Sequence, residues 1–180
     1  AAFVISELVI ADVSNPSTPV LVGSLSLAGS AFDIAVSGNY AFVASSVNAQ
    51  ELQIINITNP ALPVLAGSFN ASGTDDGNSV SISGARAYVT RTGAPNFVIV
   101  DISSPTSPTL LGSMNLGGTP RGTVELGNYV FVVSENNTQE LQVVNVTNPA
   151  SPVLAGSLDL SGTSNASAIA GFDSTVVIGR

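Results

Sequence analysis

The sequence contains no Cys, no His and no Lys, and its basic residues are four arginines, Arg86, Arg91, Arg121 and Arg180. Without Cys or His there can be no disulfide, no thiolate or imidazole metal site, and no Cys–His or Ser–His–Asp catalytic group. Charged residues make up only 9% of the chain, and the net charge is −8. That balance excludes nucleic acid as a partner and argues against an anionic membrane surface.

The sequence also lacks an apolar run near the roughly 18 residues of a membrane span, so we expect no membrane insertion within it. It begins AAFVISE, without a Met, a basic stretch or a long apolar core, which is typical of a mature or excised piece of a longer product and not of a signal peptide. The hydrophobic content of 44% predicts a folded chain. Its polar residues are mainly Ser, Thr and Asn, a composition that we associate with an extracellular or cell-surface location.

A seventeen-residue motif is repeated four times along the chain. The copies are LVIADVSNPSTPVLVGS (8–24), LQIINITNPALPVLAGS (52–68), FVIVDISSPTSPTLLGS (97–113) and LQVVNVTNPASPVLAGS (141–157). Their starts are 44, 45 and 44 residues apart, and the second and fourth copies agree at thirteen of the seventeen positions. Such a period indicates a repeat architecture, in which one unit cannot bury its own apolar face. We therefore take residues 1–180 as one repeat domain.

Four strand signals fill each period. In the second unit, residues 32–38 alternate apolar and polar side chains and run through a Gly-Asn turn into residues 40–45, which predicts a hairpin. Residues 51–57 are rich in β-branched side chains, and residues 64–69 follow the Asn-Pro break. No stretch has helical periodicity. Four antiparallel strands per repeat predict an all-β fold, a β-propeller of four-stranded blades.

The segments LVIAD (8–12) and FVIVD (97–101), each followed by S-x-P and then P-x-L-x-G-S, resemble the LVIVD repeat family. The resemblance covers nearly the whole chain. It implies a β-propeller of the kind found in bacterial and archaeal surface proteins, with no general activity and no catalytic residues to carry over. The second and fourth copies depart from the pattern, because Asn56 and Asn145 replace the final Asp.

The ends of the chain leave the number of blades open. By the propeller pattern, residues 1–6 are a second strand, and residues 166–171 and 174–179 are a first and a second strand. The chain then either closes a four-bladed ring by pairing its terminal strands, which removes exposed edges, or is part of a larger propeller. A third alternative is the exchange of terminal strands between chains, which would give a head-to-tail fibre or an eight-bladed dimer.

Charge is concentrated around one blade, at Asp75, Asp76, Arg91 and Arg121. One interpretation is a patch that binds a polar or anionic sugar, but ordinary turn chemistry explains the same residue types and is favoured. The segment GTDDGN (73–78) offers adjacent carboxylates to Ca²⁺. It lacks the spacing of an EF-hand loop, so a turn is the preferred interpretation, and we expect no metal or other cofactor.

Glu125 interrupts an apolar column. Alignment on the Gly of each inner hairpin places it level with Val36, Ile82 and Ile169. A carboxylate there is costly unless it is paired, and Arg121 lies four residues earlier. Glu125 is therefore either a ligand-binding carboxylate facing the channel or a residue turned outward by a one-residue shift or bulge, and we favour the shift.

Five N-x-[ST] sequons are candidate glycosylation sites, although the motif alone does not show modification. Asn70 and Asn136 lie in or near predicted loops and are the preferred attachment points. Asn56 and Asn145 occupy equivalent strand ends, where the sequon could be inherited with the repeat. The fifth is Asn165.

These observations favour a non-catalytic extracellular module for adhesion, recognition or spacing, with a protein or glycan at the cell surface as partner. The alternative is a structural subunit of a surface layer, pilus or filament that self-associates through terminal-strand exchange. A glycan-processing enzyme is the least favoured hypothesis. It needs two carboxylates at a defined separation, and no such pair is recognisable in the sequence.

Overall fold

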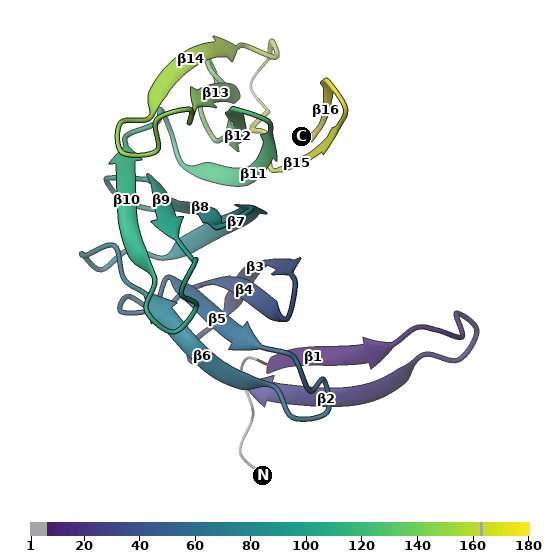
Figure 1. Ribbon diagram of the computed structural model, residues 1–180. Helices are drawn as coiled ribbons and strands as arrows, with labels where there is room; N and C mark the ends of the chain where they lie inside the picture. Colours follow the sequence, from purple (N-terminus) through teal and green to yellow (C-terminus); the bar gives the residue numbers. More distant parts are fainter. Residues whose placement is uncertain (1–6, 163) are drawn as a thin grey trace.

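The computed structural model describes residues 7–162 and 164–180, and these form sixteen β-strands in five antiparallel sheets. Figure 1 shows the sheets fanned out along an open arc, with the first and the last sheet of the chain at its two tips. None of the described residues forms a helix long and apolar enough to cross a membrane.

Three of the sheets are complete four-stranded blades. The second blade contains β3 (Ala31–Ser37), β4 (Tyr40–Ser45), β5 (Leu52–Asn56) and β6 (Val64–Phe69). The third contains β7 (Gly77–Ser83), β8 (Arg86–Arg91), β9 (Phe97–Asp101) and β10 (Thr109–Met114). The fourth contains β11 (Pro120–Leu126), β12 (Tyr129–Ser134), β13 (Leu141–Asn145) and β14 (Val153–Leu158). In each blade neighbouring strands pair in chain order, which confirms the predicted blade.

The two remaining sheets are half-blades at the tips of the arc. The first half-blade pairs β1 (Glu7–Asp12) with β2 (Val20–Ser26), and the last pairs β15 (Ala168–Phe172) with β16 (Thr175–Gly179). The repeated motif forms the third and fourth strands of a blade, so β1 and β2 are an outer half and β15 and β16 an inner half. A closed four-bladed ring, one of the alternatives that the sequence leaves open, is not observed, because the halves stand apart (Figure 1). Residues 1–6, the predicted second strand, lie outside the described residues.

The hydrophobic core lies between successive blades. Phe42 and Ile54 of the second blade share one buried cluster with Val80 and Val98 of the third. A second cluster joins the third and fourth blades in the same way, around Tyr88 and its neighbours. Each fully buried side chain of this size stabilises the fold by about 1.5–3 kcal/mol. A blade therefore buries its two faces against its neighbours, as the repeat predicts.

The Gly and the Pro of the motif set the distance between blades. A Cβ at Gly67 in β6 would overlap the carbonyl oxygen of Pro105, which belongs to the Asn/Ser-Pro turn of the next blade. Gly23 meets Pro60 in the same way, one blade earlier. The outer strand of one repeat thus packs directly on the backbone turn of the next, and only glycine fits there.

Every inner strand of the complete blades carries a β-bulge at the same place. The register skips one residue between Ala31 and Asp33, between Gly77 and Ser79, and between Pro120 and Gly122. The unpaired residues are Phe32, Asn78 and Arg121. A bulge of this kind turns the extra side chain out of the regular alternation, which determines what faces the concave side of the arc.

Candidate functional site

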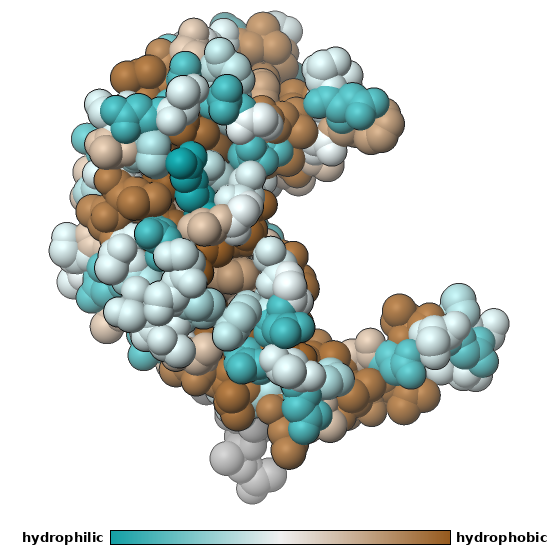
Figure 2. Space-filling model, viewed as in Figure 1, coloured by the Kyte–Doolittle hydropathy of each residue, from teal (hydrophilic) through white to brown (hydrophobic). Residues whose placement is uncertain are grey.

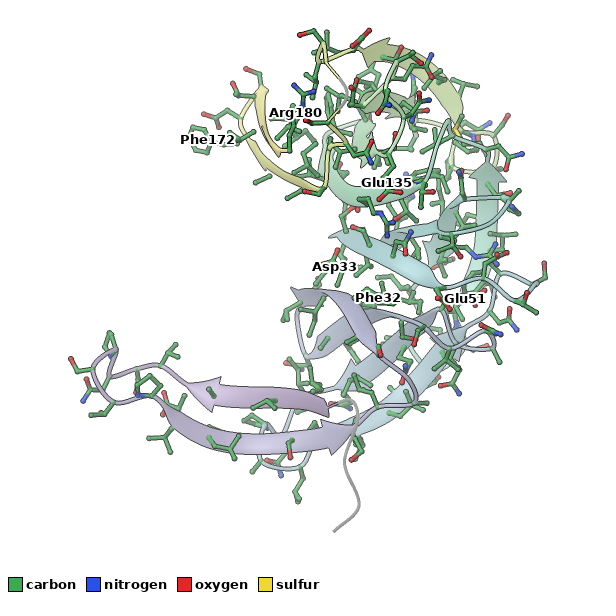
Figure 3. All side chains as sticks on the ribbon, turned by 180° about the vertical axis from the view of Figure 1, so that it is seen from behind. Phe32, Asp33, Glu51, Glu135, Phe172 and Arg180 are labelled. Atoms are coloured by element: carbon green, nitrogen blue, oxygen red, sulfur yellow. The ribbon has the colours of Figure 1, made fainter. Side chains whose placement is uncertain are left out.

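The bulged residues line a groove on the concave side of the arc. The inner strands β3, β7, β11 and β15 follow one another there. Phe32, Asn78, Arg121 and Ser167, which occupy the same position in successive repeats, line a hollow of about 310 Å³ together with Asp76 and Thr92. We call this the bulge groove. Figure 3 shows Phe32 and Asp33 on this side of β3.

The floor of the groove is a chain of polar contacts between blades. Asp33 Oδ2 accepts hydrogen bonds from the Ser79 hydroxyl (2.7 Å) and from the backbone N–H of Val80 (2.9 Å). Ser79 Oγ in turn accepts from the backbone N–H of Thr123 (3.1 Å). Three blades are thereby linked at their inner strands, and the adjoining hollow, also about 310 Å³, extends along them.

The rim carries groups that a ligand could reach. The Arg121 guanidinium forms an ion pair with Glu135 (2.8 Å), and 40% of the Arg121 side chain remains exposed. The Thr92 hydroxyl accepts from the backbone N–H of Asp76 (3.0 Å), which fixes the Asp76 loop over the groove. Phe32 leaves 54% of its surface exposed. The groove therefore offers one aromatic face among hydroxyl, amide, carboxylate and guanidinium groups.

Arg91 lies elsewhere, fully buried between the second and third blades. Its Nη2 donates to Glu51 Oε1 (3.0 Å) and to the carbonyl of Ser72 (2.6 Å), and Nη1 donates to the carbonyl of Pro95 (3.1 Å). Asp75 approaches the same Nη2 at 3.7 Å. Arg91 and Asp75 therefore belong to an ion cluster between the blades. Of the four charged residues of the predicted patch, only Asp76 and Arg121 line the bulge groove.

The adjacent carboxylates of Asp75 and Asp76 do not converge. Asp75 faces Arg91, whereas Asp76 lines the bulge groove. Within the part of the chain that the structure describes, no three Asp or Glu residues group as a metal site would require. Residues 73–76 form a loop, and Gly77 and Asn78 are the first two residues of β7.

Glu125 keeps its place in the column, so the favoured one-residue shift is wrong. Glu125 pairs with Val130 as Val36 pairs with Ala41, because the bulge of β11 lies upstream, between Pro120 and Gly122. Its neighbours Val124 and Leu126 lie against Gly171 of β15, so Glu125 points to the opposite face.

The sequence alignment also places the wrong residue of the last half-blade level with Glu125. Gly171 occupies its column there and pairs with Val176, while Ile169 lies two residues earlier. Asp173, with φ of 52°, takes the turn position that glycine holds in the other hairpins. The sequence alignment relied on a glycine that is not the turn residue. Arg121 pairs with Glu135, so it is not the partner of Glu125.

The last residue of the third strand accepts a hydrogen bond whether it is Asp or Asn. Asp12 and Asp101 accept from the backbone N–H of Ser14 and Ser103, and Asn56 accepts from Thr58 in the same way, at 2.8–2.9 Å. The hydrogen bond from Ser103 lowers the pKa of the Asp101 carboxyl. Replacement of the final Asp of the motif by Asn therefore keeps this turn, since both side chains offer the required oxygen.

The five sequon asparagines differ in accessibility. Asn70 and Asn165 are exposed, whereas Asn56 and Asn145 are half-buried at their strand ends. Asn136 is also half-buried, and its side-chain nitrogen lies where a Cβ on Gly117 would be. The backbone turns at the four sequons before Asn165 are closed by the asparagine side chain itself, which accepts from residue i+2.

The sequence does not single out Phe32, Asp33 and Asn78, which line the groove and its adjoining hollow, or Glu135, which pairs with Arg121. They could have been found by comparing the inner strands column by column. The position taken by Phe32, Asn78, Arg121 and Ser167 changes in every repeat, whereas the strands around it keep their pattern. Asp33 had no such signal, because its role depends on a partner 46 residues away.

Comparison with known protein families decides the classification. The LVIVD repeat model matches residues 2–26, 28–71, 76–116 and 122–160, well over half of the chain. The chain belongs to the LVIVD repeat family. The four matches coincide with the first half-blade and the three complete blades, so the LVIVD repeat of this chain is a β-propeller-like blade. A search of curated proteins found no match.

Solved structures share the fold at low sequence identity. The chain is similar to the computationally designed Ika4 protein, with 13% identity, a TM-score of 0.66, and 85% of this chain and 86% of that chain covered. A protein from Lactobacillus plantarum has 16% identity and a TM-score of 0.70, with 83% of this chain and 48% of that chain covered. The designed Ika8 protein has 14% identity and a TM-score of 0.64, covering 99% of this chain and 54% of that chain. This chain thus spans about half the length of the last two.

Proposed function

We propose that this LVIVD repeat chain is a non-catalytic recognition module that binds neutral glycans through the bulge groove. The observation that carries the proposal is the exposed ring of Phe32 among hydrogen-bonding groups in one hollow. A pyranose presents an apolar C–H face and a polar rim of hydroxyls. An aromatic ring can pack against the first, while Asp76, Thr92 and Arg121 can hydrogen-bond the second.

The charge around the groove favours a neutral sugar over an anionic one. Glu135 already neutralises Arg121 at 2.8 Å, and the whole chain carries a net charge of −8. An anionic ligand would meet a repulsive field and would have to displace Glu135 from Arg121. Neutral hexoses need neither change.

The carboxylates of the groove suit binding better than glycoside hydrolysis. Asp33 already accepts from the hydroxyl of Ser79, from the N–H of Val80 and from its neighbour Ile34. Both of its oxygens therefore serve the fold. A glycosidase requires two carboxyl groups free to act on the sugar from both sides. An extracellular or cell-surface location, proposed from the Ser-, Thr- and Asn-rich composition, would expose the groove to such sugars.

A glycan array probed with the labelled 180-residue chain tests this function, with Phe32→Ala as the decisive variant. We expect binding to neutral glycans, weakened about tenfold by Phe32→Ala, since a truncated aromatic anchor costs more than about 1 kcal/mol. Phe172→Ala is the matched control, because Phe172 is exposed on the last half-blade, away from the groove (Figure 3). Absence of any glycan binding, or equal binding by both variants, overturns the proposal.

A further inference from the structure

The two half-blades are complementary parts of one blade. β15 and β16 correspond to the first and second strands, β1 and β2 to the third and fourth, and the second strand pairs with the third in every complete blade. The pairing of β4 with β5 predicts the missing ladder: Val177 opposite Ile10, as Phe42 lies opposite Ile54. Among the described residues no further strand pairs with β16 or with β1, so these two edges have the register to form one ladder.

The edge of β1 that faces away from β2 is apolar, and no strand of the described residues pairs with it. Val9 is 55% exposed, although the residues at its position in the second and third blades, Gln53 and Val98, are at most 1% exposed. Two adjoining apolar hollows of about 280 and 260 Å³ lie between β1 and β3, where the inner strands of a complete blade would be. Figure 2 shows hydrophobic side chains open to solvent along this half-blade.

The last half-blade, at the other tip of the arc, also exposes an apolar residue whose equivalents in the complete blades are buried. Val177 in β16 is 68% exposed, whereas Phe42 and Tyr88, at the same position of β4 and β8, are 2% exposed. Those two rings pack into the clusters that join one blade to the next. Val177 would therefore become buried only if another blade followed the last half-blade.

Gly156 indicates which turn should pack against the outer strand of the fourth blade. Cβ atoms at Gly23, Gly67 and Gly112 would each overlap the carbonyl oxygen of a proline in the next blade, Pro60, Pro105 and Pro149. Gly156 is the fourth glycine of this series, and no atom of residues 7–162 or 164–180 lies within 4 Å of the corresponding point. The Asn-Pro turn that remains without such a glycine belongs to the first half-blade, at Pro16.

Glu140 gives independent evidence that the interface between the fourth blade and the last half-blade is incomplete. Glu51 and Glu140 are equivalent, and each accepts from a backbone N–H twenty residues later. Glu51 Oε1 is paired with Arg91, but Glu140 Oε1 is buried and finds no partner among the described residues. Arg180, the equivalent of Arg91, donates instead to the carbonyl oxygen of Leu160 at 3.0 Å, the residue whose backbone N–H donates to Glu140. The last interface is thus built only in part.

We propose that two copies of this chain complete each other's terminal blades and close a ring of eight four-stranded blades. In each junction β16 of one copy pairs with β1 of the other, and Gly156 receives the carbonyl of Pro16. A second copy, and not the chain's own end, is the occupant, because the two half-blades stand at opposite tips of the arc (Figure 1). Two solved chains of the same fold are about twice as long as this arc.

Cysteine crosslinking tests the pairing, since the chain has no Cys of its own. Phe42 and Ile54 form a non-hydrogen-bonded pair, so Val177 and Ile10 should bring their Cα atoms to about 4.5 Å, within disulfide reach. We expect the double variant Val177→Cys/Ile10→Cys to form a covalent dimer of twice 18.0 kDa on oxidation. The control, Val177→Cys/Val9→Cys, places its thiols on opposite faces and should not crosslink. A crosslinked monomer, longer chains of linked copies or no crosslink each overturn the proposal.

Gly156→Ala tests the ring in the absence of crosslinking. The substitution meets open space in the single chain but would overlap Pro16 in the dimer, so the dissociation constant should rise by about tenfold or more. The measurement is analytical ultracentrifugation, with circular dichroism to confirm the fold and Ser157→Ala as the control. An unchanged dimer, or a wild-type chain that is monomeric, contradicts the proposal. Glycan binding is a separate property of Phe32, so either proposal can fail without the other.

Discussion

Glu51 and Arg91 form a buried ion pair, 3.0 Å between Oε1 and Nη2, that joins the second and third blades. Neither side chain is more than 1% exposed. The pair also fixes the loop before β7, because Glu51 Oε2 accepts from Ala71 and Arg91 donates to Ser72. Figure 3 shows Glu51 set back from the groove residues. Arg91, which the sequence offers as a candidate for a ligand-binding patch, therefore belongs to the blade interface.

Removal of one partner of this pair should be far more harmful than removal of both. Arg91→Met leaves Glu51 charged and buried, which should lower the free energy of unfolding by about 3–5 kcal/mol. Glu51→Gln in the same chain removes the uncompensated charge and keeps an acceptor for Ala71, so the double variant should recover part of the loss. Urea denaturation measures both. A double variant as unstable as Arg91→Met would contradict this account.

The motif glycines should respond to alanine according to what lies beside them. Gly112→Ala overlaps the carbonyl of Pro149 and should lower the free energy of unfolding by about 1–3 kcal/mol. Gly156→Ala meets no atom of the described part of the chain within 4 Å and should change the free energy of unfolding by less than about 0.5 kcal/mol in the monomer. Thermal denaturation at a dilution where the chain is monomeric checks the difference, and equal losses would refute the packing argument.

Stability should fall in acid through the Asp101 turn. The hydrogen bond from Ser103 lowers the pKa of Asp101 below its ordinary 3.8. The carboxylate therefore contributes stability above pH 3.8 that is lost as the pH falls through the lowered pKa. Asp101→Asn keeps the hydrogen-bond acceptor, as Asn56 and Asn145 do, so it should leave the stability near pH 7 unchanged. It should also reduce the loss of stability as the pH falls below about 4.

Melting temperatures of wild type and Asp101→Asn between about pH 2 and 7 measure this effect. Asp173→Asn is the control, because the exposed Asp173 carboxylate accepts no hydrogen bond within residues 7–162 and 164–180. If the melting temperature falls with decreasing pH in Asp101→Asn as it does in wild type, this carboxylate is not the cause of the acid instability.

Exposure should decide which sequons are used when the chain passes through a secretory pathway with N-glycosylation. Asn70 and Asn165 are exposed and should be modified, whereas Asn56 and Asn145 are half-buried at strand ends and should not be. Peptide mass spectrometry after enzymatic deglycosylation in heavy-oxygen water reports each site. Modification of Asn145 with Asn70 unmodified would show that the folded structure does not govern access.

Local features of this fold could be predicted because they depend on neighbouring residues. The hairpin from β3 to β4 follows from alternation and a Gly-Asn turn, and the end of β5 from Asn59-Pro60. The bulge at Phe32 could not be predicted in the same way. Nothing near Phe32 in the sequence marks the register skip, which is defined by its pairing with β4.

The candidate site was predicted only in part for the same reason. Asp76 and Arg121 are loop and bulge residues whose charge attracts attention in a sequence. Arg91 has the same appearance, but its ionic partner lies 40 residues away in another blade. Asp33 was overlooked because a lone acidic residue in a strand signals nothing until Ser79 is placed beside it.

By itself, the sequence determined the repeat, the four strands of each blade and the family, since these follow from periodicity and from Pro and Gly at fixed spacings. The tertiary structure decided which charges are buried, which residues form the bulge groove, and that two complementary half-blades remain at the tips of an open arc. The buried charge pair and the Asp33–Ser79 contact depend on partners in another blade, 40 or more residues away, and the bulges depend on the pairing between neighbouring strands. Burial and electrostatics act through space, so a local pattern cannot encode them alone.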